Sequence, residues 1–178
     1  HPVRRFYEDL GLDLTLNPYQ QLADSFHRQY LARVPECSLF NDVRDALAAF
    51  QHAGMTQSIL SALPHLILEQ SVSRLGLAHF FTQVRGLDSS HADSKVANAH
   101  AWMAEQDYTS NEVLLIGDTD HDAEVARALG IDCILISRGY QDAVVLATCG
   151  WPVFDSAAAV VEHLRLPCGR AVRSARAA

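Results

Sequence analysis

The sequence has 178 residues, 49% of them hydrophobic, and carries a formal net charge of −7 at pH 7. This length suits one domain of ordinary size with a small appendage. The acidic balance excludes general nucleic-acid affinity, because there is no basic excess to neutralise phosphates. No apolar run is long enough to span a membrane, no secretory signal is visible, and the four cysteines lack the spacing of a zinc site or disulfide framework. We therefore expect a cytoplasmic protein that binds neither nucleic acid nor membranes.

The first predicted elements are helices. Residues 3–10 are expected to end a first helix, and Asn17 followed by Pro18 opens a second helix that stops before Pro35. Apolar residues on one face predict a third helix at residues 41–53. The chain therefore opens with helices before any strand signal.

From Met55 onward, short apolar strands alternate with helices. Strands are predicted at residues 55–60, 81–85, 113–116, 133–136 and 153–154, and helices at residues 64–75, 94–103, 119–129, 142–147 and 156–164. This alternation predicts an α/β fold with a parallel sheet and helices on both faces. The Arg- and Ala-rich residues 167–178 show no apolar face, and we expect them to form a flexible tail.

Three aspartates follow the strand at residues 113–116. Asp118, Asp120 and Asp122 stand in the turn between this strand and the next helix, with Thr119 and Asp122 in capping-box spacing. Open α/β folds place their chemistry at this carboxyl end of the strands. Carboxylates packed so closely repel one another, and a Mg²⁺ ion with oxygen ligands is the simplest compensation. Ordinary turn and helix-start roles suit the same residues.

Two further residues stand where they could join this cluster. Ser61 directly follows the apolar strand at residues 55–60, so its hydroxyl is expected at the same sheet edge, although Ser is also a common turn residue. Lys95 lies in the first turn of its helix, where the helix dipole disfavours a cation. Residues that violate local preferences in this way tend to occur at functional sites. The alternative is that Lys95 is an ordinary solvated surface charge.

Taken in order, these residues resemble the motifs of the haloacid dehalogenase-like (HAD) hydrolase superfamily, in particular the phosphoglycolate phosphatase type with a helical cap. Ser61 matches the second motif of that family, Lys95 the third, and residues 117–122 the fourth. The resemblance implies a partial helical cap at residues 1–36 and a Rossmann-like core at residues 37–166.

The resemblance also implies an activity, namely Mg²⁺-dependent hydrolysis of a small phosphorylated metabolite through an aspartyl-phosphate. Asp118 would ligate Mg²⁺, and Asp122 would assist through the metal's shell or by hydrogen bonding. Lys95 would hold the charges of nucleophile and phosphoryl group together, while Ser61 and Ala62 would bind phosphoryl oxygens. A metal ion, an ammonium and a hydroxyl are what an anionic phosphoryl-transfer transition state requires.

One family motif has no match. The first motif, a strand ending in Asp-x-Asp, supplies the nucleophile and should precede the cap, but residues 12–15 hold a single carboxylate between helices. One interpretation takes Asp118-Thr119-Asp120 as that motif; we favour the metal-site role, because Gly117 precedes it and Ser61 and Lys95 lie upstream.

We therefore expect the parent protein to supply the nucleophile from a segment upstream of His1. The core would then lack its first strand, which belongs in the middle of the family's sheet, and neighbouring strand edges would be unpaired. The chain alone would be inactive by the aspartyl-phosphate route. The alternative is a noncatalytic HAD-fold module that serves binding or assembly.

Overall fold

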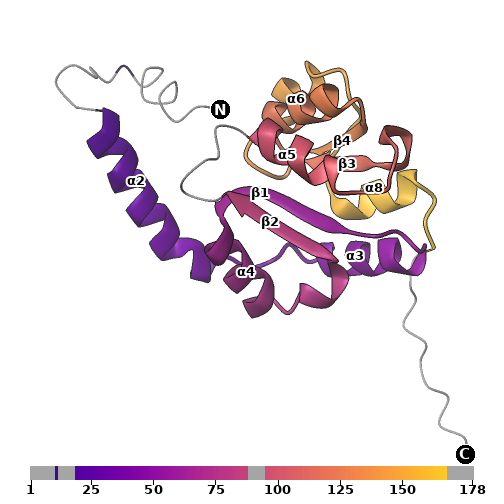
Figure 1. The fold of residues 1–178 in the computed structure, drawn as a ribbon, viewed down its shortest axis with the longest axis horizontal. Helices are drawn as coiled ribbons and strands as arrows, with labels where there is room; N and C mark the ends of the chain where they lie inside the picture. Colours follow the sequence, from indigo (N-terminus) through magenta and orange to yellow (C-terminus); the bar gives the residue numbers. More distant parts are fainter. Residues whose placement is uncertain (1–10, 12–18, 88–94, 168–178) are drawn as a thin grey trace, which may run out of the picture.

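The computed structural model describes residue 11, residues 19–87 and residues 95–167 (Figure 1). In chain order the elements are α2 (Tyr19–Arg33), η1 (Val34–Glu36), α3 (Val43–His52), β1 (Ser58–Pro64), α4 (His65–Arg74), η2 (Ala78–Phe80), β2 (Gln83–Leu87), α5 (Lys95–Ala104), η3 (Ser110–Glu112), β3 (Leu114–Gly117), α6 (Asp120–Leu129), β4 (Asp132–Ile136), α7 (Ala143–Ala147), β5 (Val153–Phe154) and α8 (Ala157–His163). The expected alternation of strands and helices, and with it the α/β class, is confirmed.

Some predictions fall on residues outside the described ranges. These are the helix at residues 3–10, the Asn17–Pro18 helix start, the residue before Lys95 and the tail beyond Pro167. The third helix begins at Val43, two residues later than expected. Asp42 is its N-cap residue but makes no side-chain cap hydrogen bond, because its carboxylate bonds to Arg138 and Ala158 N.

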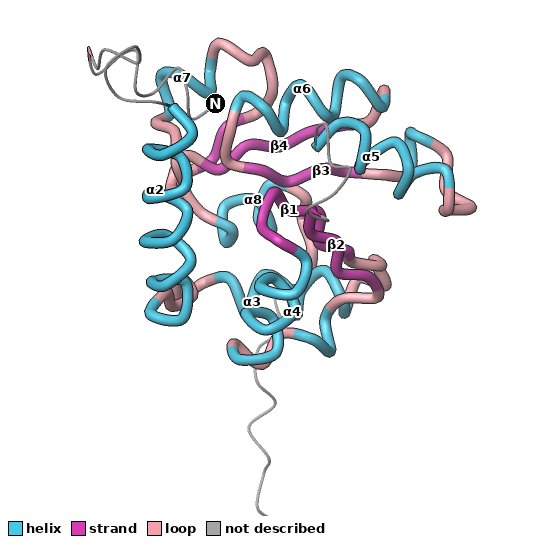
Figure 2. Tube along the Cα trace, turned by 60° about the vertical axis from the view of Figure 1, so that its left-hand side comes forward, coloured by secondary structure: helices cyan, strands magenta, loops and turns pink. Residues whose placement is uncertain are grey.

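The strands form two sheets rather than one (Figure 2). β1 pairs with β2, while β3, β4 and β5 form a second sheet in that order, and every pairing is parallel. Both views show β1 on the β3 side of the three-stranded sheet, yet no hydrogen-bonded ladder joins β1 to β3 within the described residues. The facing edges of these two strands are therefore unpaired in this part of the chain.

Helices cover both faces of the three-stranded sheet. α3 and α8 pack on one face around Ile134, and α6 and α7 pack on the other face around Cys133 and Leu135. The side chains of β4 alternate between the two clusters because successive residues of a strand point to opposite faces. α3 also packs Leu47 against the cluster formed with α4 and β1, while its Phe50 packs with α8. α3 therefore connects the cores of the two sheets.

β1 is placed differently from the prediction. The expected strand at residues 55–60 is observed at Ser58–Pro64, so Ser61 lies inside the strand's bounds rather than after them. Regular pairing with β2 ends at Leu60, and the register shifts beyond it. On β2, Gly86 lies opposite this irregular stretch of β1, and a Cβ atom at Gly86 would overlap the backbone of Leu63. The glycine permits the close approach, so Ser61 begins a bulged end of β1.

α2 stands apart from the two sheets (Figure 1) and packs mainly against η1. It ends at Arg33, before Pro35, as the sequence predicts. On its surface the exposed rings of Phe26 and Tyr30 stack with centroids 5.9 Å apart. The assignment of residues 1–36 to a cap stays a prediction. Among the described helices, none combines the length and hydropathy that a membrane crossing requires.

Candidate active site

The turn between β3 and α6 is held by its own hydrogen bonds. A Cβ atom at Gly117 would overlap the Asp122 side chain, so the glycine allows the two residues to pack directly. Thr119 is the N-cap of α6: its Oγ1 accepts a hydrogen bond from Asp122 N at 3.3 Å, and Asp122 Oδ2 accepts from Thr119 N at 3.0 Å. The predicted capping box is confirmed. It delivers Asp118 to the carboxyl end of β3.

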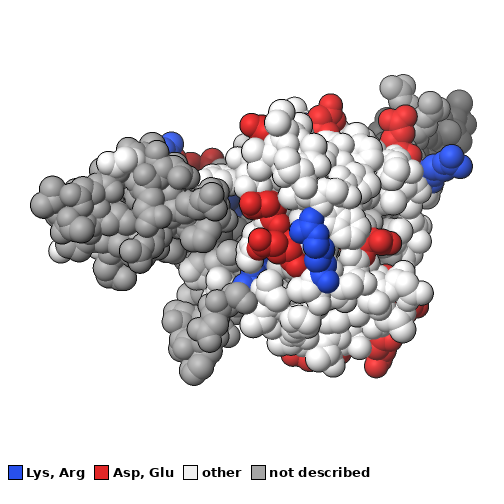
Figure 3. Space-filling model, turned by 90° about the horizontal axis from the view of Figure 1, so that it is seen from above, with Lys and Arg blue, Asp and Glu red and all other residues white. Residues whose placement is uncertain are grey.

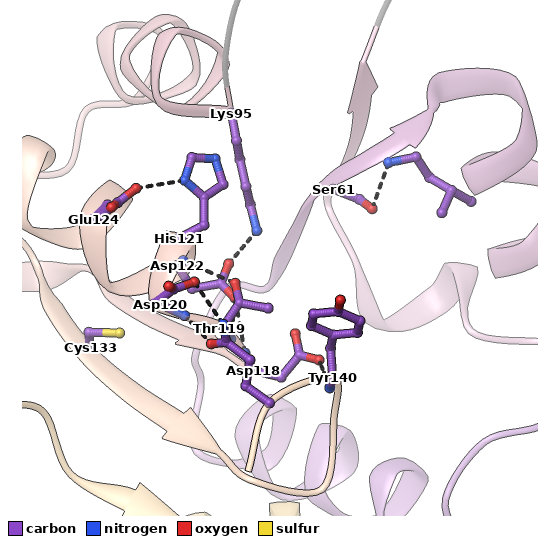
Figure 4. Close-up of polar contacts among 12 residues, drawn as sticks. Ser61, Lys95, Asp118, Thr119, Asp120, His121, Asp122, Glu124, Cys133 and Tyr140 are labelled. Carbon is purple, nitrogen blue, oxygen red and sulfur yellow. Dashed lines mark hydrogen bonds and ion pairs between the residues drawn. The ribbon is translucent and has the colours of Figure 1, made fainter. Parts of the chain in front are cut away.

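Lys95 and Asp122 form a partly buried ion pair (Figure 4). Lys95 Nζ donates to Asp122 Oδ1, and the two side chains are 16% and 4% exposed. Asp122 Oδ2 also accepts from Asp118 N at 3.0 Å and from Thr119 Oγ1 at 2.7 Å. Both oxygens of this carboxylate are therefore engaged. Lys95 is the only lysine in the sequence.

The surroundings of Asp122 keep it ionised. Burial acts to raise its pKa, but the Lys95 charge and the hydrogen bonds from Lys95, Thr119 and Asp118 outweigh burial, so the pKa lies below its ordinary value. On the neighbouring strand, burial raises the pKa of the Cys133 thiol to about 12, and the charge of Asp122 adds to this shift. Cys133 is therefore a neutral thiol at physiological pH rather than a nucleophile.

The loop that follows β4 packs against Asp118. Asp118 Oδ2 accepts a hydrogen bond from Tyr140 N at 2.9 Å, and a Cβ atom at Gly139 would overlap the Asp118 carboxylate. The side chain of Tyr140 is 66% exposed beside it (Figure 4). Asp118 is thus held from a neighbouring loop, whereas Asp122 is held by Lys95.

Ser61 lies across from these residues, on β1. Figure 4 shows Ser61 on one side and Lys95 and Asp118 on the other. Ser61 Oγ accepts a hydrogen bond from Leu63 N at 3.1 Å, and the adjacent Ala62 is exposed. The structure therefore brings a hydroxyl, an ammonium and a carboxylate from three distant parts of the chain to the same end of the two sheets.

Asp118 is a carboxylate that could supply one ligand to a Mg²⁺ ion, with the other ligands coming from elsewhere. Within the described ranges, no three or more His, Cys, Asp or Glu side chains form a cluster suited to a metal ion. Mg²⁺ in phosphate-handling sites often uses only one or two carboxylates and completes its shell with water and phosphate oxygens. Asp118 offers such a carboxylate at the carboxyl end of β3 (Figure 4). One face of the molecule also carries a group of acidic side chains beside a basic one (Figure 3). The fully engaged Asp122 fits the hydrogen-bonding role, one of the two predicted for it.

The sequence reasoning missed two contributors, Tyr140 and Gln141. Their position after β4, the strand next to β3, is the signal that could have found them, because parallel neighbours end at the same edge. Arg138 begins the same loop, but it pairs with Asp42 and lies 4.5 Å from the centre of the Phe40 ring. It is therefore engaged with the segment that leads into α3.

The chain belongs to the family of haloacid dehalogenase-like hydrolases, whose family model matches residues 4–136. It is similar to the phosphoglycolate phosphatase of Colwellia psychrerythraea, with 27% identity over 119 residues, 63% of this chain and 52% of that protein. It is also similar to the phosphoglycolate phosphatase of Synechococcus elongatus, with 28% identity over 133 residues, 71% of this chain and 60% of that protein. The chain therefore spans between half and two thirds of the length of these relatives.

Solved structures share the fold. A predicted phosphatase from Clostridium acetobutylicum superimposes with a TM-score of 0.77 at 17% identity, over 91% of this chain and 76% of that one. Protein Tyrosine Kinase A from Mycobacterium tuberculosis gives a TM-score of 0.74 at 20% identity, over 92% of this chain and 77% of that one. These likenesses confirm the Rossmann-like core. Because the two proteins carry different functional names, the fold alone does not define the reaction.

Proposed function

We propose that this chain is the larger part of a Mg²⁺-dependent phosphatase that hydrolyses the monoester of a small phosphorylated metabolite. The observation that carries the proposal is that Ser61, Lys95 and Asp118, from three distant parts of the chain, lie at the same end of the two sheets. Such a set of groups can neutralise the charge that spreads over a transferring phosphoryl group. Membership of the hydrolase family and the phosphatase names of its relatives support the same reaction class.

Each residue has a distinct role in this proposal. Lys95 holds the negative charges of the nucleophile and the phosphoryl group together, and Asp122 fixes the position of Lys95. Ser61 and Ala62 bind phosphoryl oxygens from the β1 side. Asp118 ligates Mg²⁺, which polarises the phosphoryl group when it is bound.

The nucleophile belongs, in our proposal, to an upstream segment that adds a strand between β1 and β3. Two observations support this insertion. The facing edges of β1 and β3 are unpaired within the described residues, and Ile116 on β3 is 39% exposed, although a central parallel strand is buried on both faces. A carboxylate at the end of that strand would stand near Lys95 and Asp118. It would attack phosphorus and release the alcohol, and water would then hydrolyse the aspartyl-phosphate.

A noncatalytic HAD-fold module is the second candidate. It is favoured by the lack, among the described strands, of one that lies between β1 and β3 and carries a nucleophile. The interpretation of Asp118-Thr119-Asp120 as the nucleophile motif also stays open. In that case Asp118 itself would carry the phosphoryl group.

The test is phosphate release by the complete protein, with its upstream sequence restored, from a panel of phosphomonoesters. We expect EDTA to abolish release and Mg²⁺ to restore it. Asp118→Asn should lower kcat by about 100-fold or more, since it removes a preorganised charge. Asp132→Asn is the matched control, because Asp132 is exposed at the opposite, amino end of β4.

Two outcomes would redirect the proposal. The absence of metal-dependent release from every phosphomonoester would favour the noncatalytic module. If the phosphorylated residue in trapped enzyme, identified by mass spectrometry, is Asp118 rather than an upstream aspartate, Asp118 is the nucleophile. Intact-mass measurement and sequencing of the amino terminus of the natural protein would show directly whether a segment precedes His1.

A further inference from the structure

Gln141 is a buried polar residue that the proposed reaction does not use. It is 8% exposed, and both ends of its amide contact Asp120. Gln141 Oε1 accepts from Asp120 N at 2.6 Å, and Gln141 Nε2 donates to Asp120 Oδ1 at 3.0 Å. The opposite amide orientation would place donor against donor and acceptor against acceptor, so this pair of contacts fixes the side chain. The amide therefore binds both the backbone and the carboxylate of a single residue.

The backbone contact meets a need of helix α6. The first N–H groups of a helix have no acceptor within it. The capping box provides hydrogen-bond acceptors for Thr119 N and Asp122 N. The acceptor for Asp120 N is Gln141 Oε1. An acceptor for the start of α6 thus comes from the loop after another strand, so the position of the turn depends on that loop.

The same loop also holds Asp118. Tyr140 N donates to Asp118 Oδ2, and the next residue, Gln141, holds Asp120. Two consecutive residues of one loop therefore bind two alternate residues of the acidic turn. Loss of either attachment would free the loop to move away from the turn, and Asp118 would lose its only hydrogen bond from this loop to its carboxylate.

From these contacts we infer that Gln141 is a positioning residue, which keeps the acidic turn against the loop after β4 so that Asp118 is directed toward a divalent cation. The metal-directed part of this inference rests on the proposed function. The attachment itself rests on the hydrogen bonds between Gln141 and Asp120. The two parts can be measured separately.

The experiment compares Gln141→Met, which keeps the side-chain length and removes the amide, with the unmutated chain. Gln106→Met is the matched control, because the half-buried amide of Gln106 bonds to Trp102 O and Gln83, away from the turn. Amide hydrogen exchange measured by NMR should accelerate about tenfold at Asp120 in Gln141→Met and remain unchanged in the control. The dissociation constant for Mn²⁺, measured by EPR of the free ion on the complete protein with its upstream sequence restored, should rise about tenfold in Gln141→Met only.

A second variant, Gln141→Ala, guards against a failure of the first to fold, because it removes the same amide without placing a thioether against Asp120. The exchange at Asp120 should again accelerate about tenfold relative to the unmutated chain. Unchanged exchange at Asp120 in Gln141→Met would overturn the attachment. Faster exchange with an unchanged Mn²⁺ dissociation constant would overturn the positioning role and leave Gln141 as a structural residue. If the complete protein without substitutions binds no Mn²⁺, the metal site of the proposed function fails, and the exchange at Asp120 alone decides the attachment.

Discussion

β3 and β4 are neighbours in one sheet and have similarly apolar sequences, yet their burial differs. Cys133, Ile134 and Leu135 on β4 are at most 3% exposed, whereas Ile116 on β3 is 39% exposed. β4 has a strand partner on each edge and helices on each face, but β3 has a strand partner on the β4 side only. β3 therefore has the apolar sequence of a central strand, but among the described residues it has a partner strand on one edge only.

The strongest way to test this comparison is to truncate a side chain of the doubly paired strand. Leu135 is fully buried between β4, α6 and α7. Leu135→Ala should lower the free energy of unfolding by about 2–5 kcal/mol, because it removes buried methyl groups and leaves a cavity. Urea unfolding followed by circular dichroism measures this change.

The matched truncation on β3 should cost much less. Ile116→Ala should lower the free energy of unfolding of this chain by about 1 kcal/mol or less, since the side chain is partly in water. In the complete protein, a strand inserted beside β3 would bury Ile116 and raise the cost above about 2 kcal/mol. Equal costs in the two proteins would contradict the inserted strand.

A change at the Lys95–Asp122 pair tests the proposed reaction centre beside β3. Lys95→Met should lower the free energy of unfolding by about 2 kcal/mol, because it leaves a buried carboxylate with hydrogen bonds but without its cation. It should also abolish phosphate release by the complete protein. Lys95→Arg separates charge from shape, since a guanidinium keeps the charge but not the compact ammonium. Full activity in Lys95→Met would contradict the role proposed for Lys95.

Acid should weaken the same pair. The pKa of Asp122 is lowered in the folded chain, so its stabilising effect is fully present above the ordinary aspartate pKa of about 3.9 and is lost as the pH falls through the lower folded-state pKa. The free energy of unfolding should therefore decrease as the pH falls below about 4. Asp122→Asn should show a smaller decrease over this range. Identical pH profiles in urea titrations would show that Asp122 is not responsible.

The smallest effect is expected at Arg138. Its pair with Asp42 is partly exposed, with side-chain exposures of 37% and 19%. Arg138→Met should change the free energy of unfolding by less than about 1 kcal/mol, because exposed ion pairs contribute little. Thermal unfolding at low and high salt measures the change. A much larger loss would show that the packing of Arg138 over Phe40, rather than its charge, supports the start of α3.

The order of elements was predictable because their signals are local. The capping box of Thr119 and Asp122 begins α6, and Gly130 ends it with a positive φ of 65°. Short apolar runs gave the strands, and their alternation with helices gave the parallel pairing. These features depend on residues a few positions apart, which a linear sequence displays directly.

The rest of the site depends on which strands are neighbours. Tyr140 and Gln141 contact the acidic turn because β4 pairs with β3. Residues near them in the sequence do not predict these contacts. The end of β1 was misplaced for a similar reason. Gly86, on the partner strand, allows the irregular pairing that places Ser61 inside the strand.

Because Lys95 is the sequence's only lysine, reagents that modify primary amines have a single side-chain target. Reductive methylation with isotopically labelled formaldehyde would place one NMR reporter there, in addition to the label on the amino terminus. The resonance of that dimethylamine would respond to inorganic phosphate, to Mg²⁺ or to an added upstream peptide. The protein thus carries its own spectroscopic probe at the centre of the proposed chemistry.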